Sequence, residues 1–140
     1  MRVSLVHMFT VAAMFALTGT ATMQAAEQAR FHLSTPAHWG HAVLPPGDYK
    51  VLLPAPAIGQ MAFRVDGPSK SMYEFPLSAD KSRHYSAYSY LKLSEVDGSY
   101  FIRELSLGPS GKTFTFSVPK SAYHQQMTNG RDSRVALSVR

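Results

Sequence analysis

The 140-residue chain contains no cysteine and few charged residues, only 16% of the total. The absence of cysteine excludes a disulfide framework, a thiolate zinc site, a cysteine nucleophile and the anchor cysteine of a lipoprotein. The low charge, together with 45% hydrophobic residues, excludes an intrinsically disordered protein. A chain of this length has room for one domain rather than two.

The motifs of common enzyme classes are also missing. The chain has no Gly-x-Ser-x-Gly nucleophile elbow, no glycine-rich phosphate loop and no dinucleotide fingerprint. Its 9 acidic residues are scattered, and most lie in or beside turns or near the termini, so no catalytic carboxylate pair is indicated. We therefore expect a protein that is not an enzyme and needs no cofactor. A weak hydrolase with a Ser-His-Asp arrangement stays open as an alternative.

The first 26 residues have the layout of a secretory signal peptide. Arg2 precedes a mostly apolar run over residues 3–17, and small and polar residues follow it. The apolar run has about 15 residues, whereas spanning a bilayer takes roughly 20. We expect cleavage within 21–26, export to the periplasm or the extracellular space, and a mature domain over 27–140 with no transmembrane segment. A retained membrane anchor is the alternative.

The mature chain consists of short segments in which apolar and polar residues alternate, the pattern of an all-β domain. Gly, Pro and Asp separate these segments at a spacing of roughly 8–12 residues. The pattern predicts a single-domain antiparallel β-sandwich, or a partly open barrel, of about seven or eight short strands. The apolar positions expected to share a face are Phe31 and Leu33; Tyr49, Val51 and Leu53; Met61, Phe63 and Val65; Tyr73, Phe75 and Leu77; Phe114, Phe116 and Val118; and Val135, Leu137 and Val139.

One of these segments has the features of an edge strand. Pro76 lies within the run from Ser71 to Ser78 and has no backbone N–H to give to a neighbouring strand. We therefore expect this run to form an edge strand or a bulge. An uncovered edge is a candidate surface for self-association.

Asp97-Gly98 is the strongest turn signal in the chain, and it predicts a hairpin between residues 86–96 and 99–107. A two-residue turn would place Lys92 directly opposite Arg103, an unfavourable pair of like charges. A one-residue bulge beside the turn glycine would shift that pairing, so the register of the hairpin stays open.

Two blocks of the mature chain share a pattern with other proteins. The first, from Trp39 to Tyr49, reads WGHAVLPPGDY, and the second contains LKLSEVDGSYFIREL, from Leu91, and FSVPK, ending at Lys120. The order WGxAxLPxGxY, LxLxxxDGxYxVxxL and FxxPK resembles that of small, functionally uncharacterised secreted β-proteins of acidobacterial type. The resemblance covers most of the mature chain in patches. It implies a secreted β domain and carries no catalytic or binding residues.

Aromatic residues provide one candidate binding surface. Trp39, the only tryptophan, is expected to pack in the core, and stacking on a sugar ring is the alternative. Tyr88 and Tyr90 share a strand face with Lys92 and could form an aromatic and basic platform for a glycan or an acidic polymer. The other interpretation is that these tyrosines simply cover the sheet as ordinary strand formers.

Three histidines provide a second candidate site. His32, His38 and His41 lie close together around Trp39 and could bind zinc or copper if their side chains converged. Their spacing is loose and the segment holds no carboxylate, so ordinary surface histidines are the alternative interpretation.

The net charge of +5 is spread along the chain, which argues for at most a weak attraction to anionic polymers of the cell envelope. We expect no nucleic-acid partner. We expect an exported, non-catalytic β domain that serves as a structural or binding module, with a polysaccharide or a protein of the cell envelope as candidate partner. The alternatives are a glycan-binding module that uses Trp39, Tyr88, Tyr90 and Lys92, and a metal binder that uses the three histidines.

Overall fold

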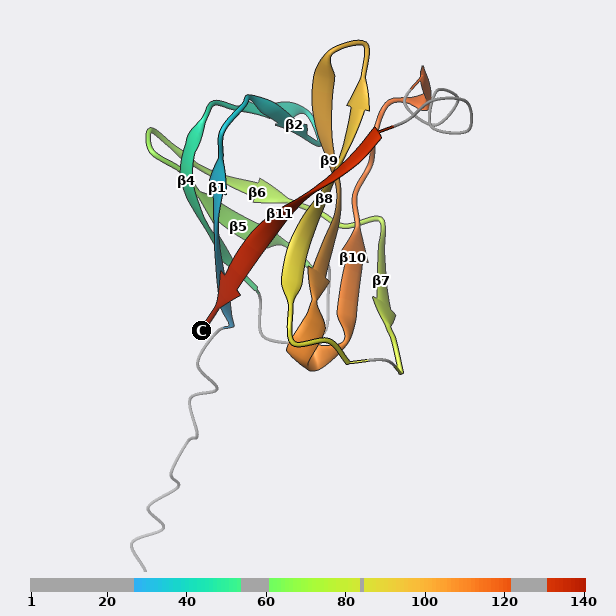
Figure 1. Cartoon of the computed structure of the whole chain (residues 1–140). Coiled ribbons are helices and arrows are strands. Elements are labelled where there is room, and N and C mark those ends of the chain that lie inside the picture. The colour runs from blue at the N-terminus through green and yellow to red at the C-terminus, as the bar shows by residue number, and fades with distance from the viewer. Residues whose placement is uncertain (1–26, 54–60, 84, 122–130) are drawn as a thin grey trace, which may run out of the picture.

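The computed structural model describes residues 27–53, 61–83, 85–121 and 131–140, and the expected signal segment lies outside these ranges. The described residues are nearly all β and form eleven strands (Figure 1). The elements are β1 (Gln28–Leu33), β2 (Ala37–Trp39), β3 (Ala42–Leu44), β4 (Gly47–Leu52), β5 (Phe63–Asp66), β6 (Ser71–Glu74), β7 (Ser78–Lys81), β8 (Ser89–Val96), β9 (Ser99–Leu107), the short 3-10 turn η1 (Gly108–Ser110), β10 (Lys112–Thr115) and β11 (Arg131–Val139).

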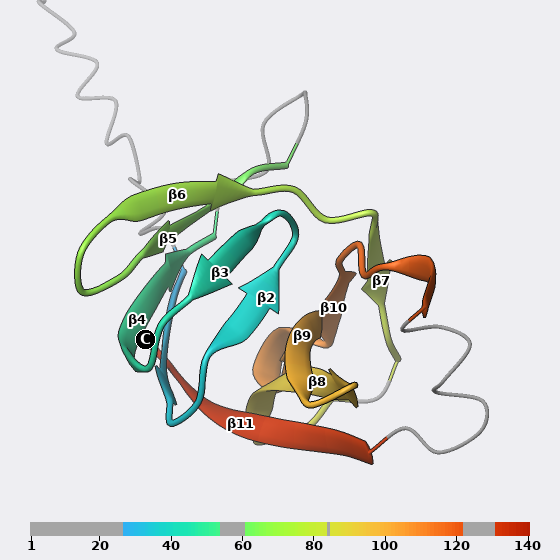
Figure 2. The same ribbon diagram turned by 90° about the horizontal axis from the view of Figure 1, so that it is seen from above.

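The strands belong to one curled, mixed sheet with the outline of a half-barrel (Figure 1, Figure 2). The main path across the sheet is β3-β2-β9-β8-β11-β1-β4-β5-β6. β10 also pairs with β9, along the same edge as β2, and β7 pairs with β10. Since β6 and β7 follow one another along the chain, residues 75–77 connect two distant parts of the sheet. The curl encloses the core.

The structure differs from the sequence prediction in the number and pairing of strands. The described part of the chain has eleven strands rather than seven or eight, because β2 and β3 form an extra short hairpin and a break at residues 75–77, around Pro76, separates β6 from β7. β2 pairs with β9 in parallel, so the sheet is not purely antiparallel. The expected sandwich is not confirmed, and the curled sheet is closer to the alternative, a partly open barrel.

The hairpin predicted at Asp97-Gly98 is confirmed, and both turn residues have positive φ, 50° and 75°. A bulge between Lys92 and Leu93 shifts the register, so that Lys92 lies opposite Glu104 rather than Arg103. The bulge therefore lies within the hairpin instead of beside its turn. It exchanges a repulsive cross-strand pair for an attractive one.

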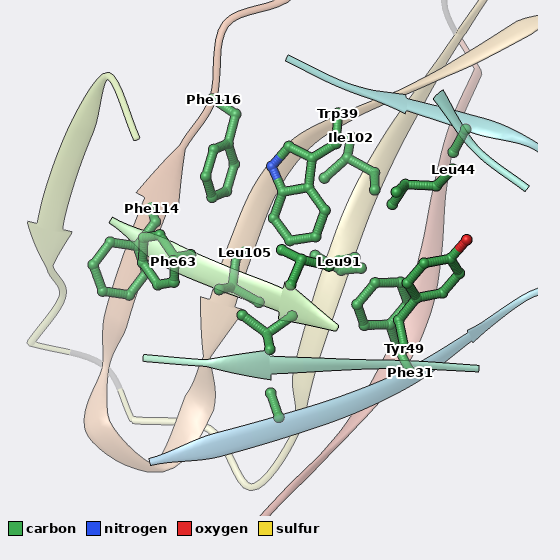
Figure 3. Packing of buried hydrophobic residues seen from close by; sticks show 14 of the residues in the cluster. Phe31, Trp39, Leu44, Tyr49, Phe63, Leu91, Ile102, Leu105, Phe114 and Phe116 are labelled. Carbon is green, nitrogen blue, oxygen red and sulfur yellow. The ribbon is translucent and has the colours of Figure 1, made fainter. Parts of the chain in front are cut away.

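The core lies inside the curl, and aromatic rings form much of it (Figure 3). Phe63 packs edge to face against Phe114 and Phe116, with ring centroids 4.8 and 5.8 Å apart. Phe31 stacks on Tyr49 at 5.3 Å. Such pairs add to the free energy gained by burying the rings, about 0.5–1.5 kcal/mol each.

Most of the predicted inward faces are confirmed. The named apolar residues of β1, β4 and β10 are buried, and Val135, Leu137 and Val139 of β11 pack against the core. Met61 differs, because it precedes β5 and its side chain is 37% exposed. Tyr73, Phe75 and Leu77 also differ from the prediction, because all three side chains are exposed to solvent.

Candidate functional site

Trp39 is fully buried on β2. Its ring meets Phe116 edge to face at 5.0 Å and Phe31 at 6.1 Å. Among the described residues its Nε1 has no hydrogen-bond partner, and Figure 3 shows this nitrogen on the side of the indole that faces Phe116. The expectation of core packing is confirmed. A covered ring cannot stack on a sugar, so Trp39 does not belong to a glycan site.

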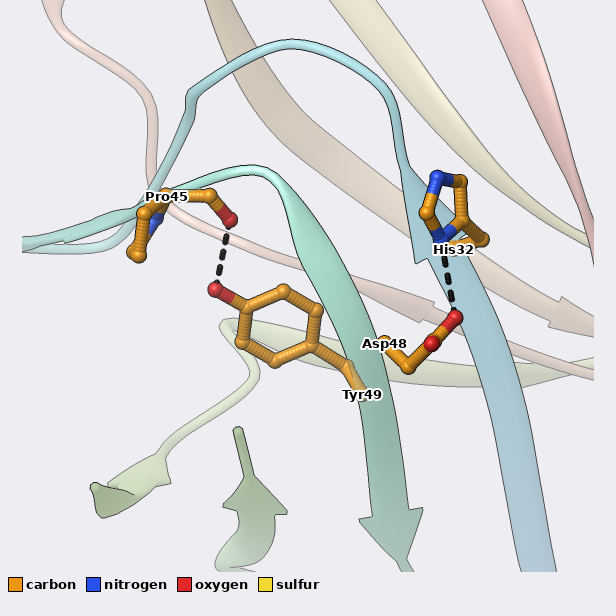
Figure 4. Close-up of polar contacts among 4 residues, drawn as sticks. All are labelled: His32, Pro45, Asp48 and Tyr49. Carbon is orange, nitrogen blue, oxygen red and sulfur yellow. Dashed lines mark hydrogen bonds and ion pairs between the residues drawn. The ribbon is translucent and has the colours of Figure 1, made fainter. Parts of the chain in front are cut away.

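The three histidines do not converge. His32 on β1 is exposed, and its Nδ1 lies 2.8 Å from Oδ1 of Asp48 (Figure 4). His38 on β2 stacks on Phe101 at 4.7 Å, and His41 lies in the turn between β2 and β3. Within the described ranges, no three His, Cys, Asp or Glu side chains form a group that could hold a metal ion. The alternation along β1 points His32 outward, away from the other two.

Two of the predicted platform residues have partners within the protein. The guanidinium of Arg134 lies over the Tyr90 ring, 4.6 Å from its centroid, and the Tyr90 hydroxyl donates to Glu104 at 3.4 Å. Nζ of Lys92 lies 3.0 Å from a carboxylate oxygen of Asp132. These contacts occupy the ring face and the charge that a glycan would need.

The third platform residue, Tyr88, lies directly before β8 and is largely exposed. The strand begins at Ser89, and the Tyr88 side chain is 79% exposed. Because Tyr90 and Lys92 are engaged by partners within the protein, Tyr88 is the most exposed of the three side chains suggested for the platform.

Asp132 on β11 contacts two polar side chains of β8, Lys92 and Ser94. Partial burial alone would raise the pKa of this carboxyl. The ion pair with Lys92, the hydrogen bond from Ser94 and the charge of Arg103 outweigh burial and hold the pKa below its ordinary value. The carboxylate is thus retained as an anion that ties β8 to β11.

An open hollow of about 700 Å³ lies over the outer face of β1, β4, β5 and β11. Of its two carboxylates, Asp48 contacts the His32 ring, and Asp66 forms an ion pair with Arg64. Hydrogen bonds from Ser71 and Arg64 lower the pKa of Asp66. A carboxyl held as an anion by its neighbours is poorly suited to donate a proton to a substrate.

Exposed apolar side chains gather at the end of β6 and on the segment that connects it to β7. Tyr73, Phe75 and Leu77 are 62%, 54% and 65% exposed, whereas the alternate residues Met72 and Glu74 are partly buried. We call the first three residues the apolar row. A contiguous set of large exposed apolar side chains marks an interaction surface more often than scattered ones do.

The apolar row carries no charge of its own. The nearby charged residue on the same segment, Glu74, points inward, and its carboxylate lies against Gly40 in the turn between β2 and β3. Burial raises the pKa of Glu74, and the charge of His41 lowers it by a smaller amount. The inward direction of this carboxyl leaves the solvent side of the segment apolar.

Comparisons with protein-family models, with curated proteins and with solved structures find no match for this chain. No residue role is therefore transferred from a relative. In the described part of the chain, no helix has the length and apolar character needed to cross a bilayer.

Proposed function

We propose that residues 27–140 form an exported, non-catalytic structural module that self-associates through the apolar row. The signal-like composition of the first 26 residues supports export. The observation that carries the proposal is the exposure of three large apolar residues at alternate positions of a single segment, Tyr73, Phe75 and Leu77. Monomeric proteins rarely leave such a group of side chains in water.

A second copy of the chain is the occupant that fits this surface best. The row is centred on Phe75, with one large apolar side chain two residues away on either side. A twofold axis through Phe75 therefore sets Phe75 against its own copy and Tyr73 against Leu77 of the other copy. Every apolar side chain then meets another, as an isologous interface requires.

Side-chain packing, rather than extension of the sheet, would form this contact. Pro76 has no backbone N–H, which removes a donor from the middle of the segment. The neighbouring edge strand β7 presents Asp80 and Lys81, and charged residues on an edge discourage strand addition. Completing the burial of three side chains on each copy would contribute roughly 1–2 kcal/mol per side chain. The total for the two copies, about 6–12 kcal/mol, exceeds the cost of association by a small margin and predicts a weak dimer.

Sedimentation equilibrium tests this proposal. The full chain is expressed, and the protein is purified in the form that the cell produces from it. We expect the average mass to rise from monomer toward dimer with concentration. Phe75→Ser should shift the transition to much higher concentration, because it removes the residue on the twofold axis. Tyr88→Ser, at a still more exposed aromatic residue away from the row, serves as the control. A parent protein that stays monomeric at its solubility limit would contradict self-association.

A further inference from the structure

A second surface lies at the end of the molecule where β7 stops and β10 begins (Figure 1). Lys81 and Lys112 are directly paired across these strands. The backbone N–H of Ser82 then donates to the carbonyl of Gly111 at 2.8 Å, and that of Ser86 to Gly108 at 3.0 Å. The segment that follows β7 therefore wraps around η1. We call the exposed residues brought together there the cationic end: Lys81, Arg83, Tyr85, Tyr88 and Lys112.

Along the two segments that form the cationic end, the one acidic residue is Asp80, directly before Lys81. The chain contains no Asp or Glu between residues 81 and 94 or between 105 and 131. The nearest acid in sequence is Asp80, which lies opposite Thr113 and accepts a hydrogen bond from Ser78. Because successive side chains of a strand point to opposite faces, Asp80 is turned away from Lys81.

The two lysines share a face and lack a carboxylate partner. All 9 acidic residues lie within the described ranges, and none of the ion pairs found there involves Lys81, Arg83 or Lys112. Like charges directly opposite one another destabilise a strand pair. A bound anion between Lys81 and Lys112 would relieve that repulsion.

An exposed aromatic ring, that of Tyr85, lies next to the residue before Lys112, and a second exposed tyrosine, Tyr88, packs its backbone against η1. The ring of Tyr85 rests against Gly111, where an added Cβ would lie 3.3 Å from Cε1 of the tyrosine. The backbone of Tyr88 is held against Gly108 in the same way, and the two side chains are 65% and 79% exposed. Each ring offers water an apolar face and a hydroxyl, a combination that suits ligands with both apolar faces and hydroxyl groups.

We propose that the cationic end binds an acidic polysaccharide. The lysines and Arg83 would contact its carboxylate or sulfate groups, and Tyr85 and Tyr88 would pack against its sugar rings. Nucleic acids and anionic membranes share the charge requirement. The site is independent of the apolar row, so the failure of one proposal leaves the other unaffected.

Titration calorimetry of the purified protein with dextran sulfate, polygalacturonate and neutral dextran tests the proposal. We expect one or both of the acidic polymers to bind, with an affinity that falls as salt rises, and neutral dextran not to bind. Lys81→Gln and Lys112→Gln should each weaken binding about tenfold, as the loss of one charge-assisted contact predicts. Tyr88→Ser should weaken binding several-fold while leaving the salt dependence unchanged.

Lys70→Gln is the matched control, because Lys70 is an exposed lysine beside the turn between β5 and β6. Thermal unfolding separates a binding role from a structural one: Lys81→Gln should raise the midpoint of the free protein, because it removes a repulsion, while it weakens binding. The proposal is overturned if neither acidic polymer binds, or if Lys70→Gln weakens binding as much as Lys81→Gln. Tighter binding to a single-stranded oligonucleotide or to phosphatidylglycerol vesicles would also overturn it.

Discussion

The indole of Trp39 links the β2–β3 hairpin to the rest of the core. Its ring contacts Phe31 of the preceding strand β1 and Phe116, which lies far away in the chain, after β10. Because β3 pairs only with β2 within the described sheet, the hairpin depends on side-chain packing as well as on its parallel pairing with β9. Trp39, which the sequence also suggested as a glycan ligand, therefore holds this hairpin against the core.

We expect Trp39 to fluoresce with a blue-shifted maximum and to resist acrylamide quenching, because the ring is 0% exposed. Trp39→Ala should lower the free energy of unfolding by about 3–5 kcal/mol, as expected for the loss of a large buried aromatic. Trp39→Phe should cost less, since it keeps an aromatic ring in the cavity. Urea unfolding followed by circular dichroism measures both. Tyr88→Ala should change stability little, and a red-shifted, easily quenched Trp39 would contradict the buried position.

At the scale of elements, the crossing of the segment before β8 over η1 depends on a glycine. A Cβ at Gly108 would overlap the carbonyl oxygens of Ser86 and Tyr88, although the φ of this glycine is not in the left-handed region. Gly98, in the β8–β9 turn, is the opposite case: it has φ of +75° and open space around its Cα. The two glycines are required for different physical reasons, close approach in one and backbone conformation in the other.

Gly108→Ala and Gly98→Ala should therefore differ in cost. We expect Gly108→Ala to destabilise the fold by about 3 kcal/mol or more, because backbone atoms must move to admit the methyl group. Gly98→Ala should cost about 1 kcal/mol, the strain of a left-handed alanine. Chemical denaturation of both variants gives the comparison. If the cationic end binds polyanions, Gly108→Ala should also weaken that binding, and equal costs for the two substitutions would argue against the close crossing.

At the scale of the whole molecule, β11 holds the two halves of the curled sheet together. Val139 lies opposite Ala29 on β1, and Val135 lies opposite Leu91 on β8. No other strand of the described sheet joins β1 to β8, so the halves are linked by hydrogen bonds through β11. This arrangement predicts that a fault in β11 is felt throughout the domain.

Leu137→Asp should lower stability by about 3 kcal/mol, because it places a charge where the side chain packs against the core. Trp39 fluorescence and circular dichroism should report the same shifted transition, as expected for a single cooperative unit. Ser138→Asp, at the adjacent exposed position, is the matched control and should be nearly neutral. Separate transitions for the two probes in Leu137→Asp would show that the halves fold independently.

Local signals in the sequence correctly predicted the β class, the turn at Asp97-Gly98 and most inward faces. These features depend on near neighbours: a two-residue period sets which side chains share a face, and Gly and Asn or Asp tolerate positive φ. The register of the hairpin was left open, because both a regular turn and a bulge fit the local sequence. The pairing of Lys92 with Glu104 follows from a bulge that only the assembled sheet specifies.

Local sequence thus indicated the β class, the main turn and the alternation within most strands, because backbone conformation and side-chain alternation are local properties. The number of strands was wrong, because the β2–β3 hairpin and the break around Pro76 were not foreseen. Only the packing of the whole domain specified which apolar residues are covered by other strands: Trp39 is buried, whereas the apolar row is exposed to solvent. It separated His32 from His38 and His41, and it set Lys81 opposite Lys112 across thirty-one positions of sequence. Periodicity carries no information on whether another strand packs on a face, since that depends on residues distant in the chain.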